Sequence, residues 1–257
     1  MTDFLDKLIA DAEKRVTRGY YDVNVKADHK HLSLLRAIKS SKHNAIIAEI
    51  KPRSPTRGPL RAEFDPKEAA IQLARGGAAG ISVLTEPENF GGTIENLVQI
   101  RPVVDIPLLM KDVVIHEKQI DAARNSGADC ILLMLSALIR KRIQPTDLII
   151  KAHSVQLEVI IEAHDAQELE QASETNSEII GINNRNLKDL EIDLNTTTSL
   201  LDSVPQLQGK TIISESGLES IEDIRRLKRK HVDGFLIGSS IMLATDLAGK
   251  VREFVYA

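Results

Sequence analysis

The chain has 257 residues, of which 42% are hydrophobic and 27% are charged, and its net charge is −4. These values are typical of one globular domain with a sizeable core. No apolar run approaches the roughly 18–20 residues that span a bilayer. The acidic balance does not favour nucleic acid or an anionic membrane. The first residues lack the features of a signal peptide, and the single cysteine, Cys130, excludes an intramolecular disulfide, so we expect a cytoplasmic protein.

The first 44 residues precede the first apolar strand. Phe4, Leu5, Leu8, Ile9 and Ala12 recur at helical spacing and predict one helix, and a second helix is predicted near 31–40. We interpret residues 1–44 as a helical extension that caps the structure that follows. No linker rich in proline, glycine and serine interrupts the chain afterwards, which predicts a single domain over residues 1–257.

Eight short apolar runs then alternate with polar stretches of helical length. The predicted strands are Ala45–Ile50, Gly80–Leu84, Pro107–Lys111, Asp129–Leu135, Leu157–Ala163, Glu178–Asn183, Lys210–Ser214 and Asp233–Ile237. Strands that alternate with helices form parallel sheets, and continuous apolar runs are typical of strands buried on both faces. Eight such units in about 250 residues predict an α/β fold, the closed (β/α)8 TIM barrel, preceded by the helical extension.

The connections carry further predictions. Helices are expected at Pro66–Gly76, His116–Gly127 and roughly 137–154. The segment Pro52–Leu60 holds three prolines and a glycine, so we expect no regular structure there and interpret it as a mobile lid over the site.

Charged and amide side chains gather where the predicted strands end. They are Glu49, Lys51, Lys111, Glu162, Asn183, Arg185 and Glu215. In a barrel, the carboxyl ends of the strands converge on one cavity, which is where active sites of this fold lie. One interpretation is that these groups pair as salt bridges of the barrel rim. The favoured interpretation is an acid–base site, because three carboxylates and three cations come from five different strands.

Lys111 ends an apolar strand. We expect burial and nearby cations to lower its pKa, which would suit a general acid, and the same residue could instead form a Schiff base. Two glycine turns, at Ser216-Gly217 and at Gly238-Ser239, follow the seventh and eighth strands and predict a phosphate site.

Other site classes find little support in the sequence. No His-Glu-x-x-His or Cys-x-x-Cys pattern occurs, so no metal site is predicted. The basic run 225–231 has helical spacing and is interpreted as a solvated helix face, not as a nucleic-acid patch.

The chain resembles the indole-3-glycerol-phosphate synthase family. The resemblance rests on IIAEIKPRSPTRG, ISVLTEPENFGG, LLMKD, ADCILLML, IIEAHDAQEL, IIGINNRNL, ISESGL and FLIGSSIM, which occur in this order over roughly residues 45–245. It implies a tryptophan-pathway lyase of the barrel fold. Its reaction converts 1-(2-carboxyphenylamino)-1-deoxyribulose 5-phosphate to indole-3-glycerol phosphate by ring closure, decarboxylation and dehydration. It also implies that neither a metal nor another cofactor is needed. Val113 stands where many members have an aromatic residue.

The resemblance also implies roles. Lys111 would be the general acid, Glu162 the general base of the dehydration, and Lys51 the group that positions the substrate carboxylate. The other expected site residues, which hold hydroxyl groups, support the charges, bind phosphate or contact the apolar part, are Glu49, Asn183, Glu215, Arg185, Ser54, Ser216, Gly217, Gly238, Ser239, Phe90 and Leu236.

Three alternatives stay open at this point. The barrel could be a Schiff-base aldolase that uses Lys51 or Lys111, an inactive sugar-phosphate-binding protein, or phosphoribosylanthranilate isomerase, whose carboxylate and thiol chemistry has no match here. The expected partner is a small phosphorylated substrate, with no nucleic acid and no membrane. We expect a monomer or a weak homo-oligomer.

Overall fold

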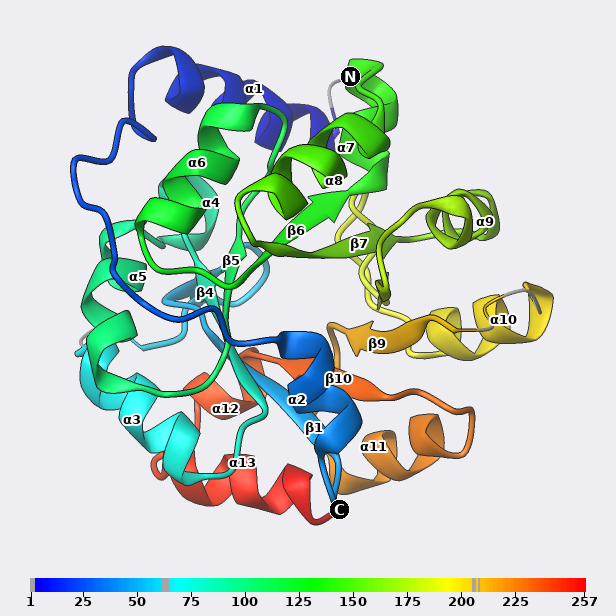
Figure 1. Cartoon of the computed structure of the whole chain (residues 1–257). Coiled ribbons are helices and arrows are strands. Elements are labelled where there is room, and N and C mark those ends of the chain that lie inside the picture. Colours follow the sequence, from blue (N-terminus) through cyan, green and yellow to red (C-terminus); the bar gives the residue numbers. More distant parts are fainter. Residues whose placement is uncertain (1–2, 62–64, 205–206, 208) are drawn as a thin grey trace.

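The computed structural model describes residues 3–61, 65–204, 207 and 209–257, and it contains a closed barrel of parallel strands surrounded by helices (Figure 1). Around the barrel, each strand pairs with the next in the order β1-β10-β9-β8-β7-β6-β5-β4. The bounds are β1 (Ala45–Ile50), β4 (Gly80–Leu84), β5 (Leu108–Lys111), β6 (Cys130–Met134), β7 (Glu158–Ala163), β8 (Ile179–Asn183), β9 (Thr211–Glu215) and β10 (Gly234–Ile237). The predicted (β/α)8 barrel is therefore confirmed, with every strand bound within one residue of its prediction.

Alternation along each strand decides which side chains reach the interior. In β1, Ile46 and Ile50 belong to the core layer between barrel and helices, whereas Ile47 belongs to a second cluster inside the barrel. Glu49 lies on the same face of the strand as Ile47, and Lys51 follows it by two residues. The same alternation places the polar residue at each strand end above an apolar interior.

Two helices precede the first strand, and the others follow the strands of the barrel. They are α1 (Phe4–Thr17), α2 (Leu34–Ser40), α3 (Pro66–Arg75), α4 (Pro87–Phe90), α5 (Glu95–Ile100), the 3-10 turn η1 (Arg101–Val103), α6 (Glu117–Asn125), α7 (Leu135–Lys141), α8 (Pro145–Ser154), α9 (Ala166–Glu174), α10 (Asn195–Ser203), α11 (Ile221–Lys228), α12 (Ser239–Met242) and α13 (Leu247–Val255).

One predicted helix is wrong. The stretch 137–154 forms two helices, because Arg142 adopts a left-handed conformation that ends α7 and Pro145 begins α8 at a first-turn position. The basic run 225–231 is confirmed as a surface feature: Ile224 and Leu227 of α11 are buried, while Arg225 and Lys228 are exposed.

The N-terminal segment reaches both ends of the barrel. Helix α1 lies at the mouth, where Leu8 joins the lining of the central pocket. Helix α2 lies at the opposite end, where Leu34 and Ile38 sit close to the strand-start glycines Gly80 and Gly234. The segment between the two helices runs down the outside of the barrel (Figure 1). Both predicted helices are present, and residues 1 and 2 of the predicted extension lie outside the described residues.

The segment Pro52–Leu60 corrects another prediction. Instead of lacking regular structure, it forms a short antiparallel hairpin of β2 (Arg53–Ser54) and β3 (Gly58–Pro59). Leu60 N–H also donates to the Pro52 carbonyl oxygen at 2.9 Å. Pro59 does not prevent this pairing because a two-stranded ribbon has free edges that need no N–H donor. Gly58, at a φ of 68°, adopts the left-handed conformation of the turn.

A buried ion network joins α1 to the mouth of the barrel. The guanidinium of Arg15, only 3% exposed, donates to the Tyr21 hydroxyl at 3.0 Å and lies 3.2 Å from a Glu86 oxygen and 3.0 Å from an Asp112 oxygen. Asp112 accepts a further bond from the Thr85 hydroxyl at 2.7 Å. Since Asp112 follows Lys111 directly, this network fixes the end of β5 as well as α1.

Replacing Arg15 should therefore destabilise the protein strongly. In an Arg15→Met variant, Glu86 and Asp112 would stay buried without their cation, which costs about 3–5 kcal/mol for a broken buried pair. Chemical denaturation should show this loss. The matched control is Arg18→Ala at the exposed end of α1, for which we expect a change within about 0.5 kcal/mol. Equal stability of the two variants would contradict this account of the network.

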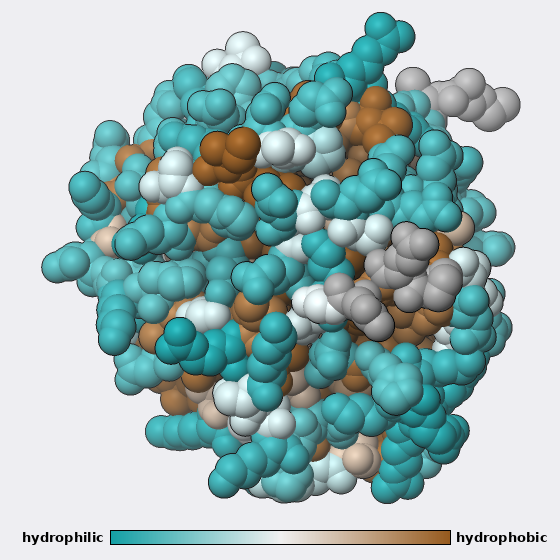
Figure 2. Space-filling model, turned by 45° about the vertical axis from the view of Figure 1, so that its right-hand side comes forward, coloured by the Kyte–Doolittle hydropathy of each residue, from teal (hydrophilic) through white to brown (hydrophobic). Residues whose placement is uncertain are grey.

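The outer surface is mixed. The face in Figure 2 is mainly hydrophilic, with small hydrophobic areas between polar side chains. Within the described part of the chain, no helix combines the length and apolar character required to span a bilayer.

Candidate active site

A pocket of about 1020 Å³, open to solvent, lies at the carboxyl ends of the barrel strands. All but one of the predicted site residues line it: Glu49, Lys51, Ser54, Phe90, Lys111, Glu162, Asn183, Arg185, Ser216, Gly217, Leu236, Gly238 and Ser239. Glu215 is 1% exposed and lies beneath this lining, in contact with Lys111. The barrel geometry thus brings together groups that are up to 190 positions apart in the chain.

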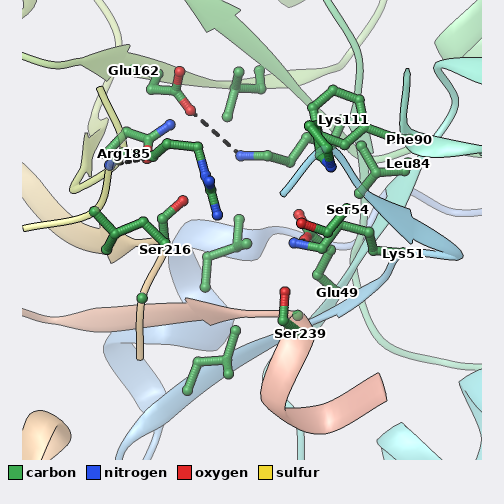
Figure 3. A pocket seen from close by; sticks show the side chains of 18 of the residues that line it. Glu49, Lys51, Ser54, Leu84, Phe90, Lys111, Glu162, Arg185, Ser216 and Ser239 are labelled. Carbon is green, nitrogen blue, oxygen red and sulfur yellow. Dashed lines mark hydrogen bonds and ion pairs between the residues drawn. The ribbon is translucent and has the colours of Figure 1, made fainter. Parts of the chain in front are cut away.

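Lys111 lies between two carboxylates. Its Nζ is 3.5 Å from Glu162 Oε2, as the dashed line in Figure 3 shows, and it forms a closer ion pair with Glu215 Oε2. Glu215 fits here only because residue 181 of β8 is glycine: a Cβ at Gly181 would meet Glu215 Oε1 at 2.2 Å. The ammonium is therefore held at the pocket wall by groups from β7 and β9.

The carboxylates reverse the expected pKa shift of Lys111. Burial lowers the pKa of Lys111, but Glu215, Glu162 and Glu49 together outweigh burial and hold it above its ordinary value. The prediction of a lowered pKa, which assumed nearby cations, is wrong because the groups that face the ammonium are anions. Lys111 thus carries its proton in the resting site and can donate a hydrogen bond to a substrate oxygen.

The two carboxylates beside Lys111 differ from each other. Burial is the main cause that raises the pKa of Glu215 to about 7, with a further contribution from Glu162 and an opposing one from Lys111. Burial also acts on Glu162, but Lys111, His164 and a hydrogen bond from Asn183 outweigh it and lower the pKa of Glu162. At neutral pH, Glu162 is therefore the carboxylate held in its charged form.

A second ion pair faces the first across the pocket (Figure 3). Lys51 Nζ lies 2.7 Å from Glu49 Oε1, with both side chains on the inner face of the β1 end. The pair is packed against Gly238, where a Cβ would meet Glu49 Oε1 at 2.4 Å. The lysines and carboxylates do pair at the rim, as the alternative interpretation expected, and the lysines also line the cavity.

Two further polar residues come from the end of β8. Asn183 Oδ1 accepts from the Arg185 backbone N–H at 3.0 Å, which shapes the turn after the strand. The Arg185 guanidinium donates to the Leu190 carbonyl oxygen at 2.9 Å and to the Thr56 hydroxyl of the hairpin at 3.5 Å. Arg185 therefore connects the β8 end with the Pro52–Leu60 hairpin.

The two glycine turns lie side by side at one end of the pocket. Ser216 and Gly217 both adopt positive φ angles, 69° and 82°, and Gly238 precedes the first turn of α12. The Ser240 hydroxyl donates to the Leu218 carbonyl oxygen at 2.9 Å and so joins the turns. First-turn N–H groups of a helix have no partner within the helix, so this end offers donors to an anion.

The lining of the pocket also includes apolar side chains. Phe90 and Leu236, which were predicted from the sequence as site residues, belong to it together with Val113. The other apolar residues of this lining were not predicted from the sequence; they are Leu8, Leu84, Leu132, Met134, Leu187, Ile192, Leu218 and Ile237. In the sequence these residues cannot be told apart from ordinary core residues, because each belongs to the apolar pattern of its strand, helix or loop. The pocket therefore combines charged side chains, two turns that offer backbone donors, and apolar side chains.

Beyond the pocket lining, two acid–base partners were also missed. His164 lies behind Glu162, with Nε2 3.3 Å from Glu162 Oε1 and Nδ1 3.1 Å from Glu168 Oε2. The available signal was the spacing: His164 is two residues beyond Glu162 and so points to the same side of the strand end. Across the described residues, no group of three or more His, Cys, Asp or Glu side chains is arranged to hold a metal ion.

The hairpin over the pocket is attached by polar contacts. Ser54, 2% exposed, shares a hydrogen bond of 3.2 Å with Thr56, and Arg57 forms an ion pair with Glu219 beside the glycine turns. Both partners of the Arg57 pair are exposed, so the attachment is weak. Such a hairpin can open to admit substrate and close over it.

We expect trypsin to cut the free protein after Arg53 or Arg57 and a substrate analogue to suppress the cut. Closure over a ligand would bury the hairpin and exclude water from the charged pairs below it. The rate of cleavage, followed with and without the analogue, measures this. A Glu219→Ala variant should be cut faster because it lacks the Arg57 partner. Equal cleavage with and without the analogue would show that the hairpin is a rigid rim.

The fold and the pocket define a class of protein: a (β/α)8 barrel enzyme that performs acid–base chemistry at the carboxyl ends of its strands. The family model described as indole-3-glycerol phosphate synthase matches residues 5–254. The chain belongs to this family, that of the carboxy-lyase of tryptophan biosynthesis.

Individual relatives agree. The indole-3-glycerol phosphate synthase of Bordetella pertussis is 42% identical over 210 residues, covering 82% of this chain and 79% of the relative. The synthase of Acetivibrio thermocellus is 38% identical over 226 residues, with 88% and 85% covered, and that of a Polaromonas species is 37% identical over 256 residues, with 96% of both covered.

Solved structures support the fold alone. A thiamine phosphate pyrophosphorylase from Pyrococcus furiosus superposes with a TM-score of 0.60 at 16% identity and covers 83% of this chain and 94% of its own. An N-acetylmannosamine-6-phosphate 2-epimerase from Clostridium perfringens gives 0.60 at 13% identity, with 84% and 93% covered.

Proposed function

We propose that this pocket binds 1-(2-carboxyphenylamino)-1-deoxyribulose 5-phosphate and closes its indole ring, with Lys111 as general acid and Glu162 as general base. The observation that carries the proposal is the position of Lys111, which is held protonated between Glu162 and Glu215 at the wall of a pocket lined by both polar and apolar groups. Family membership supports the reaction, and the geometry supports the roles.

The expected orientation of the substrate follows from the positions of the two glycine turns and of the apolar side chains in the pocket. The phosphate would lie against the turns at Ser216-Gly217 and Gly238-Ser239, with Ser54 of the hairpin above them. The aromatic ring would lie against Phe90, Leu236 and the other apolar residues. In this orientation the ketone of the substrate would lie between the two lysines. Because the protein is net negative and the substrate is a polyanion, these local cations must attract it.

The first step is ring closure. The aromatic carbon that bears the carboxylate attacks the ketone carbon, and Lys111 gives its proton to the ketone oxygen, which becomes a hydroxyl. Lys51 would hold the substrate carboxylate until it leaves as carbon dioxide and the ring regains aromaticity. Glu49 orients Lys51, and Glu215 orients Lys111 from below the pocket lining.

The second step is dehydration. The new hydroxyl leaves as water with a proton from the Lys51 ammonium, and Glu162 accepts the proton that the substrate releases to form the double bond. Asn183 is placed to hold a substrate hydroxyl, and Arg185 supports the charge balance from the β8 end. Glu162 suits this role because its pKa is lowered, so it is ready to accept a proton at neutral pH.

The test is direct. Purified protein without added metal or cofactor should convert this substrate to a product with indole fluorescence. Absence of the signal with a folded protein would sink the proposal. A Schiff-base aldolase at Lys51 or Lys111 would instead give a covalent adduct that borohydride traps, which we do not expect.

We further propose that the chain acts as a single domain in the cytoplasm, as a monomer or weak homo-oligomer.

A further inference from the structure

Glu162 has two oxygens with different neighbours. Oε2 faces the Lys111 ammonium at 3.5 Å, on the pocket side. Oε1 is buried without a hydrogen-bond partner among the described residues. It lies 3.3 Å from His164 Nε2, which is likewise buried and lacks a hydrogen-bond partner among those residues. Two unsatisfied polar atoms that face each other at this distance can share a proton with only a small rotation.

His164 is fixed from its other side. Its Nδ1 lies 3.1 Å from Glu168 Oε2, and the same oxygen accepts the His164 backbone N–H at 2.8 Å. Glu168 belongs to the first turn of α9, where Asp165 caps the helix by accepting the Glu168 N–H at 2.9 Å. The helix start thus holds the Glu168 carboxylate in place and orients the imidazole, so that Nδ1–H points to Glu168 and Nε2 points to Glu162.

The surroundings of His164 are anionic. The charged groups that act on it are Glu162 from β7, Glu168 from α9 and Glu215 from β9, and they outweigh burial and raise the pKa of His164. Lys111, the nearest cation of the catalytic cluster, lies on the far side of Glu162. An imidazolium at this position would be neutralised by two carboxylates in direct contact with it.

We propose that His164, anchored by Glu168, acts as a positioning residue that supplies a second positive charge to Glu162 and so selects Glu162, and not Glu215, as the ionised carboxylate beside Lys111. One lysine cannot neutralise two buried carboxylates equally. His164 contacts Glu162 Oε1 at 3.3 Å and leaves Glu215 with Lys111 as its cation. This inference deepens the proposed function and rests on it, because it explains how one of two carboxylates becomes the base.

The kinetic test uses His164→Gln, which keeps an N–H donor near Glu162 but removes the charge. Without that charge the pKa of Glu162 rises, so the base becomes protonated at a higher pH. The loss of kcat/KM in the variant, relative to the parent, should therefore grow as the pH is lowered. It should reach roughly tenfold or more at about pH 6, with little change in KM. The matched control is His153→Gln on the exposed face of α8, which should keep the parent profile. A loss that is the same at every pH would overturn the proposal, because that result indicates a purely structural role.

A second measurement needs no substrate and separates this inference from the proposed function. In an NMR titration of the seven histidines, the resonance missing in His164→Gln identifies His164. Its pKa should lie above the ordinary value in the parent and should fall in Glu162→Gln and in Glu168→Gln. An unchanged His164 titration in Glu162→Gln would overturn the coupling. If His164→Gln does not fold, the Glu168→Gln variant takes its place in the kinetic test, since it weakens the imidazolium and should shift the profile in the same direction. In the titration, His164→Asn then identifies the His164 resonance.

Discussion

A Lys111→Ala variant should lose turnover almost completely while it keeps its fold and most of its affinity for the phosphate end of the substrate. The ammonium acts where charge develops on the ketone oxygen, so its loss affects the transition state more than substrate binding. We expect at least about a thousandfold fall in kcat, because a general acid and a local positive charge disappear together. Turnover is measured by indole fluorescence, and binding by calorimetry with a substrate analogue.

Two further lysine variants make this result specific. Lys111→Arg keeps a positive charge that cannot release its proton, so it should also bind the substrate analogue without turnover of the substrate. Lys67→Ala removes an exposed lysine at the start of α3 and should behave as the parent. Near-normal turnover in Lys111→Ala would remove this residue from the general-acid role.

A Glu162→Gln variant should lose at least about a hundredfold in kcat. Glutamine preserves the size of the side chain but cannot accept the proton released in the dehydration, and general acid–base groups contribute about 10²–10⁴-fold. Because ring closure and decarboxylation precede the step that needs this base, the variant should accumulate a decarboxylated intermediate in single-turnover experiments. Glu170→Gln, on the exposed side of α9, is the matched control. A rate within a few-fold of the parent would make Glu162 a rim salt-bridge residue.

The barrel could be predicted from the sequence because its strands are buried on both faces. That burial requires continuous apolar runs, and their ends coincide with polar clusters such as Glu49 and Lys51 at the end of β1. The end of one helix within a longer helical stretch and the short hairpin were harder to predict. The stretch 137–154 is helical in composition on both sides of Pro145, and the hairpin at Pro52–Leu60 depends on only two paired residues in each strand.

The electrostatics of the site could not be predicted in the same way. The pKa of Lys111 depends on which charges lie within a few ångströms, and the sequence does not show that its nearest neighbours are the carboxylates of Glu162 and Glu215. The buried network of Arg15 likewise joins positions 15, 86 and 112, which share no local pattern. Contacts between distant segments decide both cases.

The pairing of β1 with β10 has a consequence for how the molecule is made. Ala45 of β1 lies opposite Gly234 of β10. One edge of β1, the first barrel strand to be synthesised, therefore stays unpaired until β10, the last one, has been made. Glu49 and Lys51 meet Gly238 only through that same pairing. Contacts of such sequence separation form slowly and late, since a long loop must close before they can stabilise the chain. Nascent or truncated chains that lack β10 would therefore expose an unpaired strand edge that can associate with other chains. Their pocket would also be incomplete, so catalytic competence would appear only at the end of synthesis.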